Sequence, residues 1–137
     1  MDSLFIVMPA YNEEENIEAV IKQWYPILEG KSEKSRLVIA DSGSSDKTHE
    51  ILMNLRKELD QLEVLTNTQR QHGPKVIALY DCAVKRGIDY IFQTDSDGQT
   101  NPDEFNMFWS LRSKYDGIFG HRNVRGDGKS RAFVEYV

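Results

Sequence analysis

The stretch that decides the fold is residues 4–14, Leu-Phe-Ile-Val-Met-Pro-Ala-Tyr-Asn-Glu-Glu. Its first five residues form a continuous apolar run closed by Pro9, which is typical of a short strand buried on both faces of a sheet. Polar and acidic residues follow at once from Tyr11, so the chain leaves the core directly after this strand. A strand of this kind predicts a parallel sheet with helices on both sides.

The same alternation of apolar run and amphipathic segment recurs along the chain. The expected strands are residues 4–8, 37–40, 62–66, 90–94 and 117–120. Apolar positions at helical spacing predict helices over 17–28, 51–59, 76–84 and 102–111, the last beginning at the N-cap Asn101. Gly87 stands where the third helix should end. This order indicates an α/β fold with a mostly parallel sheet and right-handed crossovers.

Composition narrows the class of protein. The 137 residues make one domain, and 39% apolar with 28% charged residues exclude disordered and low-complexity chains. The sequence has no apolar run long enough to span a bilayer and no secretory signal. Cys82 is the single cysteine, so no internal disulfide can form and a cytoplasmic location is expected. The net charge of -5 argues against a nucleic-acid partner.

The ends of the strands carry the main functional signal. In parallel sheets, ligands bind outside the carboxyl ends of the strands. Polar residues follow three of the expected strands, at residues 9–13, 41–44 and 95–97. We therefore expect these three segments to meet in one site.

Asp95-Ser96-Asp97 is the candidate metal site. Two carboxylates at positions i and i+2 of a tight turn can face one Mg²⁺ or Mn²⁺ ion, which would bridge diphosphate oxygens. The alternative is a polar turn without a ligand. An EF-hand loop is excluded because Thr100 and Asn106 occupy its glycine and glutamate positions. Dehalogenase-type phosphatases carry a similar motif after their first strand, where this chain has no nucleophilic carboxylate.

Two other residues have two possible roles each. Asp41 either accepts hydrogen bonds from a ribose or base, or caps the loop that follows it. Lys75 begins the third helix and suits a phosphate, but it could equally be a solvated side chain. The glycine-rich motifs of dinucleotide and P-loop sites are absent from the sequence.

The remaining candidates are simpler. Cys82 is expected in the core, and His49 and His72 at the surface. A basic loop after the fifth strand is either solvated or holds phosphate through its cations. These residues are His121, Arg122, Arg125, Lys129 and Arg131.

Three motifs in order, Val7–Glu13, Asp41–Asp46 and Asp95–Gly98, carry a family resemblance. They are similar to the V-P-x-Y-N-E, D-D-G-S-x-D and D-A-D motifs of the family-two glycosyltransferases. The resemblance covers nearly the whole chain. It implies a Rossmann-like GT-A nucleotide-diphospho-sugar transferase fold and a metal-dependent, inverting transfer of a sugar from a nucleotide-diphosphate sugar.

The resemblance also implies roles for individual residues. Asp41 would contact the base or ribose, Asp95 would lie near the ribose and diphosphate, and Asp97 would be the chief ligand of Mn²⁺ or Mg²⁺. Ser42 stands where many members have a second Asp. With Lys75, which was singled out above for its place at a helix start, the expected nucleotide-binding residues are Pro9, Ala10, Tyr11, Glu13, Asp41, Ser42, Lys75, Asp95 and Ser96, and the expected metal ligands are Asp95 and Asp97. No residue is assigned as the catalytic base.

Gly120-His121-Arg122 is similar to the Gly-Ser-Arg of the polyprenyl-phosphate sugar transferases, a branch of this family. The resemblance implies a lipid-phosphate acceptor, held in part by the basic loop, and a place in cell-envelope or glycolipid biosynthesis. A sugar or another acceptor remains open.

Two other functions stay open from the residues alone. The chain could be a nucleotide-binding or regulatory module without turnover. A nucleotidyltransferase is disfavoured because residues 11–14 are acidic where that class needs a basic, glycine-rich loop. We expect residues 1–137 to be one domain, truncated at its C-terminus, from a longer enzyme. Its remainder would be membrane-associated and would act at the cytoplasmic face.

Overall fold

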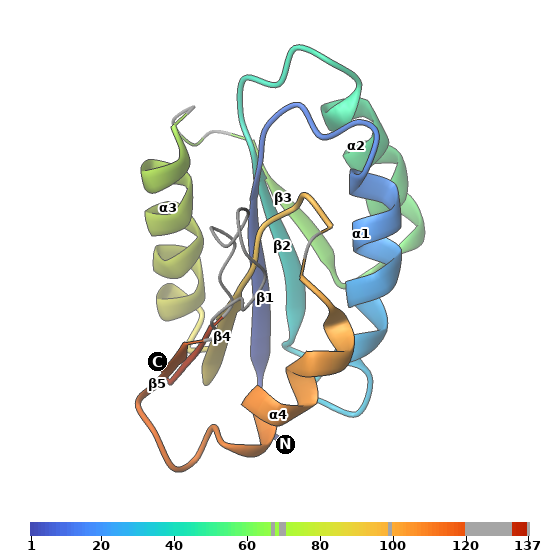
Figure 1. The fold of residues 1–137 in the computed structure, drawn as a ribbon. Coiled ribbons are helices and arrows are strands. Elements are labelled where there is room, and N and C mark those ends of the chain that lie inside the picture. Colours follow the sequence, from blue (N-terminus) through green and yellow to red (C-terminus); the bar gives the residue numbers. More distant parts are fainter. Residues whose placement is uncertain (67, 69–70, 99, 120–132, 137) are drawn as a thin grey trace, which may run out of the picture.

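The computed structural model describes residues 1–66, 68, 71–98, 100–119 and 133–136. The described strands form one sheet in the order β3-β2-β1-β4-β6-β5 (Figure 1). The strands are β1 (Leu4–Ala10), β2 (Arg36–Asp41), β3 (Leu62–Leu65), β4 (Tyr90–Gln93), β5 (Gly117–Phe119) and β6 (Phe133–Tyr136). The helices are α1 (Ile17–Trp24), α2 (Thr48–Glu58), α3 (His72–Lys85) and α4 (Phe105–Ser110), with 3₁₀ turns η1 (Tyr25–Leu28) and η2 (Pro102–Glu104).

Strand β1 lies inside the parallel part of the sheet, as its apolar run predicts. It pairs in parallel with β2 on one side and β4 on the other, and all of its residues are buried. The expectation that Pro9 closes the strand is wrong, because β1 continues through Pro9, which is in register with Ala40, to Ala10. A proline at the end of a strand removes one hydrogen-bond donor but still permits extended backbone.

The two faces of the sheet bury two different clusters. Helices α1, α2 and α4 cover one face, and α3 covers the other (Figure 1). Along β1, Leu4, Ile6 and Met8 join the cluster on the α1 side, while Phe5 and Val7 join the cluster under α3. This alternation follows from the two-residue period of a strand. It explains why the strand is apolar throughout.

Aromatic contacts hold α4 against β4 and so fix both ends of the loop between them. The Phe105 ring lies edge-on to Phe92 at 4.9 Å and to Trp24 at 6.4 Å. The helix start predicted at Asn101 is confirmed, since its side chain accepts a hydrogen bond of 2.9 Å from the Asp103 N–H. The loop that carries Asp95 and Asp97 is therefore attached to the core at each end.

Strand β6 was not predicted. It lies between β4 and β5 and runs antiparallel to both, whereas the β1–β2, β1–β4 and β2–β3 pairs are parallel. A short apolar run does not reveal the direction in which a strand inserts, because that depends on partners distant in sequence. The prediction of a mostly parallel α/β sheet is nevertheless correct.

Two further expectations concern other parts of the chain. Gly87 follows the end of α3 with φ of +67°, as expected of a residue that ends a helix. The basic loop residues His121, Arg122, Arg125, Lys129 and Arg131 lie outside the described residues. Within the described part of the chain, no helix combines the length and apolarity needed to cross a bilayer.

Candidate functional site

A pocket of about 400 Å³ opens where the carboxyl ends of β1 and β4 meet the start of α3. The residues that line it are Pro9, Ala10, Tyr11, Glu13, His72, Lys75, Asp95, Ser96 and Asp97. All of them except His72 were singled out from the sequence. The structure thus brings together residues from three separate segments at the sheet edge where ligands of parallel sheets bind.

Three carboxylates line one part of this pocket. The pKa of Glu13 is raised, chiefly by burial; a hydrogen bond from Asn16 lowers it, and the negative charges of Asp97, Asp46 and Asp95 raise it further. The negative charges of Asp97 and Asp95 are thus close enough to the Glu13 carboxylate to repel it. A cation placed there would relieve this repulsion.

The chemistry of these donors suits a divalent metal ion. Carboxylate oxygens are the ligands that Mg²⁺ and Mn²⁺ prefer, and Asp95 and Asp97 both face the pocket. Among the described residues, no group of three or more acidic, histidine or cysteine side chains encloses a metal position by itself. Water molecules or the oxygen atoms of a bound ligand would complete the coordination of such an ion, as is common for Mg²⁺.

The Asp95–Asp97 turn is attached to β1. The buried Ser96 hydroxyl donates a hydrogen bond of 3.0 Å to the Pro9 carbonyl oxygen, and the Thr94 N–H donates one of 3.1 Å to the Val7 carbonyl. Gly98 closes the turn with φ of +81°, a conformation that favours glycine. The backbone of the turn that carries the two carboxylates is consequently held beside the first strand.

Lys75 is not the solvated side chain that one interpretation of the sequence allowed. It is only 1% exposed, although it lies in the first turns of α3. Its Nζ donates a hydrogen bond of 2.7 Å to the Ala10 carbonyl oxygen and lies 5.3 Å from the centre of the Tyr11 ring. A contact between Lys75 and phosphate remains a prediction.

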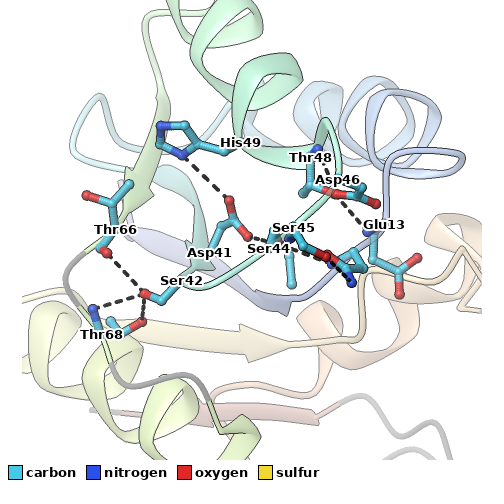
Figure 2. A network of polar contacts seen from close by, with 12 residues as sticks. Glu13, Asp41, Ser42, Ser44, Ser45, Asp46, Thr48, His49, Thr66 and Thr68 are labelled. Carbon is cyan, nitrogen blue, oxygen red and sulfur yellow. Dashed lines mark hydrogen bonds and ion pairs between the residues drawn. The ribbon is translucent and has the colours of Figure 1, made fainter.

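Asp41 lies beside the pocket but is absent from its lining. The carboxylate is buried, accepts a hydrogen bond from the Ser44 hydroxyl and lies 3.6 Å from Nδ1 of His49 (Figure 2). These contacts correspond to the interpretation in which Asp41 caps its own loop. A contact with base or ribose remains a prediction.

Ser42 is also absent from the pocket lining. Its hydroxyl donates to the Thr66 carbonyl at 3.1 Å, lies 2.6 Å from the Thr68 hydroxyl and accepts from the Thr68 N–H at 3.1 Å (Figure 2). It therefore ties the end of β2 to the chain that leaves β3. The sequence did not predict this link, because residues 24 and 26 positions away provide the partners.

The loop that follows β1 is joined to side chains of the second motif and of Thr48, the first residue of α2, an arrangement we call the loop clasp. Successive backbone N–H groups of the loop after β1 donate to these side-chain oxygens (Figure 2). The three bonds run from Asn12 to Ser44 Oγ (3.1 Å), from Glu13 to Thr48 Oγ1 (2.8 Å) and from Glu14 to Asp46 Oδ2 (3.2 Å).

Asn12 completes the clasp from the other side. Its φ of +51° lies in the left-handed region that Asn tolerates better than most residues, and its side-chain oxygen accepts from the Ser45 N–H at 2.8 Å. Short polar residues at 44–48 were the available signal for this structure, since such side chains bind nearby backbone groups. The clasp holds one wall of the pocket in place.

A second hollow of about 730 Å³ lies along β3 and carries different chemistry. Two of its arginines are already paired with Glu63, Arg86 at 2.6 Å and Arg36 at 3.4 Å. It is lined by Arg36, Met53, Arg56, Lys57, Asp60, Leu62, Glu63, Val64, Leu65 and Arg86, with none of the polar residues that follow β1 or β4. The smaller pocket at the strand ends is therefore the better candidate for the functional site.

Comparison with known proteins agrees with the fold and the motifs. Dolichyl-phosphate beta-glucosyltransferase ALG5A of Trichomonas vaginalis is 31% identical over 109 residues, which are 76% of this chain and 33% of that protein. An undecaprenyl-phosphate 4-deoxy-4-formamido-L-arabinose transferase of Photorhabdus laumondii is 26% identical over 92% of this chain and 39% of its own length. The chain thus spans about a third of the length of these curated relatives.

Solved structures show the same GT-A fold. S. aureus TarS in complex with UDP-GlcNAc superposes with a TM-score of 0.65 over 92% of this chain and 36% of its own, at 20% identity. Glucosyl-3-phosphoglycerate synthase of Mycobacterium tuberculosis, in complex with Mn²⁺, UDP and its product, has a TM-score of 0.58 over 80% of this chain and 39% of its own, at 23% identity. Residues 5–135 match the family model described as Glycosyl transferase family 2, and the chain therefore belongs to that family of enzymes.

Proposed function

We propose that the pocket at the ends of β1 and β4 binds a nucleotide-diphosphate sugar, and that the chain is the nucleotide-binding part of a metal-dependent, inverting glycosyltransferase. The observation that carries this proposal is the convergence of Tyr11, Lys75 and the Asp95–Asp97 pair in one pocket of a family 2 chain. An aromatic ring and paired carboxylates are the groups that a base and a metal–diphosphate need, respectively.

Different residues of the pocket would contact different parts of the ligand. Pro9, Ala10 and Tyr11 form the apolar part of the pocket and suit the nucleoside, with Glu13 beside them. Asp95 and Asp97 would hold Mn²⁺ or Mg²⁺, and such an ion, when bound, neutralises the charge that grows on the departing diphosphate. Ser96 orients these carboxylates through its hydrogen bond to Pro9.

In this proposal Asp41 and Ser42, which lie outside the pocket lining, support the residues that form it. The hydrogen bond from Ser44 and the nearby His49 would hold Asp41 beside Ala10, its partner across β1 and β2. Ser42 fixes the chain after β3, which leads towards α3 and Lys75. Both residues would support the shape of the nucleotide site.

The acceptor that we propose is a lipid phosphate, because relatives that act on dolichyl and undecaprenyl phosphate match this chain. Its phosphate oxygen would attack the anomeric carbon from the side opposite the diphosphate, which inverts that centre. Such an oxygen is already ionised at neutral pH, so it needs no general base. The cations of the basic loop, Arg122 among them, would hold the acceptor, and the full protein would work where a membrane presents it.

Isothermal calorimetry with UDP-, GDP- and CDP-sugars, each with and without Mn²⁺, tests the nucleotide proposal. We expect one of these donors to bind in the presence of the metal and Asp97→Ala to abolish that binding. Asp81→Ala is the matched control, since this exposed carboxylate on α3 lies outside the pocket lining and forms an ion pair of 2.8 Å with Lys85. Binding that is unaffected by metal, or no binding of any donor, would contradict the proposal.

Turnover is a separate question. Incubating the donor that binds with a polyprenyl phosphate, in detergent and with the full-length protein, should give the glycosylated lipid. Donor binding without transfer to any acceptor would instead favour a nucleotide-binding or regulatory module.

A further inference from the structure

We infer that Lys75 is a positioning residue for Tyr11, and that its ammonium sets the shape of the nucleoside side of the pocket. This inference rests on the proposed function, in which Tyr11 contacts the nucleoside. It assigns to Lys75 a task that differs from a direct contact with phosphate.

The burial of Lys75 is the first observation. Lysine side chains usually keep the ammonium group in water while the stem packs against the protein. Among the described residues, Lys75 and Asp41 are the charged residues that are almost fully buried, at 1% and 2% exposure. A buried charge is costly unless polar groups surround it, so the position of this ammonium is closely determined by its surroundings.

The contacts of Lys75 show what this position determines. The Nζ–O distance of 2.7 Å to Ala10 is that of a strong, charge-assisted hydrogen bond to the last residue of β1. The same Nζ lies 5.3 Å from the centre of the Tyr11 ring, within the range of a cation–π contact. One ammonium thus holds both the peptide before Tyr11 and the ring itself.

Tyr11 is held from its other side as well. The next residue, Asn12, donates its N–H to Ser44 and accepts from the Ser45 N–H in the loop clasp. The Tyr11 side chain nevertheless remains 44% exposed and lines the pocket. The ring is therefore restrained through its neighbours while it stays accessible to a ligand.

The two possible roles of Lys75, positioning Tyr11 and contacting phosphate, predict different effects of its loss on the binding of different ligands. If Lys75 acts through Tyr11, its loss should lower the affinity for a nucleoside and for the corresponding nucleoside diphosphate by the same factor. If Lys75 binds phosphate, the loss should be confined to the diphosphate and should shrink as salt is added.

The experiment compares Lys75→Met with Lys85→Met, a lysine of the same helix that is exposed and pairs with Asp81. Binding of the nucleoside and of its diphosphate is measured by NMR titration, for the base that wild type prefers. We expect Lys75→Met to lower the affinity for both ligands about tenfold and Lys85→Met to leave both affinities unchanged. In a Tyr11→Leu background, Lys75→Met should cost less than about twofold, because the residue through which it acts is gone. A loss confined to the diphosphate, or an undiminished loss in the Tyr11→Leu background, would overturn the inference.

Hydrogen exchange of the ligand-free protein separates this inference from the proposed function. The Tyr11 and Asn12 amides should exchange at least about fivefold faster in Lys75→Met than in wild type, whether or not any nucleotide binds. Unchanged rates would overturn the inference even if wild type binds nucleotides well. If Lys75→Met does not fold, Tyr11→Leu alone decides the matter, since a Tyr11→Leu protein with wild-type nucleoside affinity leaves Lys75 nothing to position.

Discussion

Replacing Thr48 by valine should loosen the loop clasp without changing the shape of the side chain. Thr48 is fully buried at the start of α2, and its hydroxyl has two partners. It donates to Asp46 Oδ1 and accepts a hydrogen bond of 2.8 Å from the Glu13 N–H (Figure 2). Valine keeps the volume but removes both bonds, and it leaves the Glu13 N–H without this partner.

The size of the effect follows from these contacts. A typical intramolecular hydrogen bond contributes about 1 kcal/mol, and a buried N–H left without a partner costs roughly 1–3 kcal/mol. Asp46 keeps its hydrogen bonds from the N–H groups of Thr48 and Glu14, so the loss of the Thr48 hydroxyl costs little free energy at Asp46. We expect the free energy of unfolding to fall by about 2 kcal/mol. With an unfolding entropy of about 2.1 cal/mol/K per residue over 137 residues, this lowers Tm by roughly 7 °C.

Thermal melts and amide hydrogen exchange measure the two consequences, with Thr48→Ser as the matched control. Serine keeps the hydroxyl and loses one methyl group, so it should cost about 1 kcal/mol and leave exchange at the Glu13 amide unchanged. Thr48→Val should accelerate exchange at Glu13 and also weaken nucleotide binding, because Glu13 lines the pocket. A Thr48→Val protein with wild-type Tm and wild-type exchange at Glu13 would refute the role given to the clasp.

Three further predictions concern single side chains. Because burial and acidic neighbours raise the pKa of Glu13 above 4.5, the folded state holds this proton more tightly than the unfolded state, and stability falls as pH rises above that value. Glu13→Gln should therefore raise Tm of the ligand-free protein at pH 7 and not at pH 4; a destabilised variant at pH 7 would contradict this. Burial raises the pKa of the Cys82 thiol, so alkylation at pH 8 should be slow in the folded protein and fast in urea. Equal rates in both conditions would show that Cys82 is not protected. Ser42→Ala removes the link between β2 and the chain after β3 and should cost about 1–2 kcal/mol in urea denaturation, whereas an unchanged midpoint would argue against that link.

The sequence predicted those elements whose formation depends on residues close together in the chain. The apolar run before Pro9 predicted a strand buried on both faces. The prediction is correct because alternate side chains of this strand join two different core clusters, so that every position is apolar. The N-cap Asn101 and the glycine after α3 were found because caps depend on residues a few positions apart. Strand β6 was missed because its place between β4 and β5 depends on pairing across the sheet.

The candidate site was predicted through the rule that ligands bind at the carboxyl ends of parallel strands. That rule predicted that residues 9–13 and 95–97 would meet, as the structure has them, but Asp41 and Ser42, which it also included, are absent from the pocket lining. Lys75 was predicted separately, from its place at the start of a helix. It could not predict that Lys75 would be buried against Ala10, since this contact spans 65 positions of the sequence. His72 was missed for a related reason, because only the position of α3 against β1 turns a surface histidine into a pocket residue.

The most direct test of the central claim is to map where a nucleoside diphosphate and Mn²⁺ or Mg²⁺ bind. Backbone amide NMR of the protein, titrated with UDP, GDP or CDP in the presence of Mg²⁺, reports this residue by residue. We predict that one of these ligands shifts the amides of Ala10, Tyr11, Lys75 and Ser96, and that replacing Mg²⁺ by a small fraction of paramagnetic Mn²⁺ broadens Asp95 and Asp97 most. Shifts confined to the hollow along β3, around Arg56 and Glu63, or no shifts with any of the three ligands, would contradict the claim that the pocket at the strand ends is the nucleotide site.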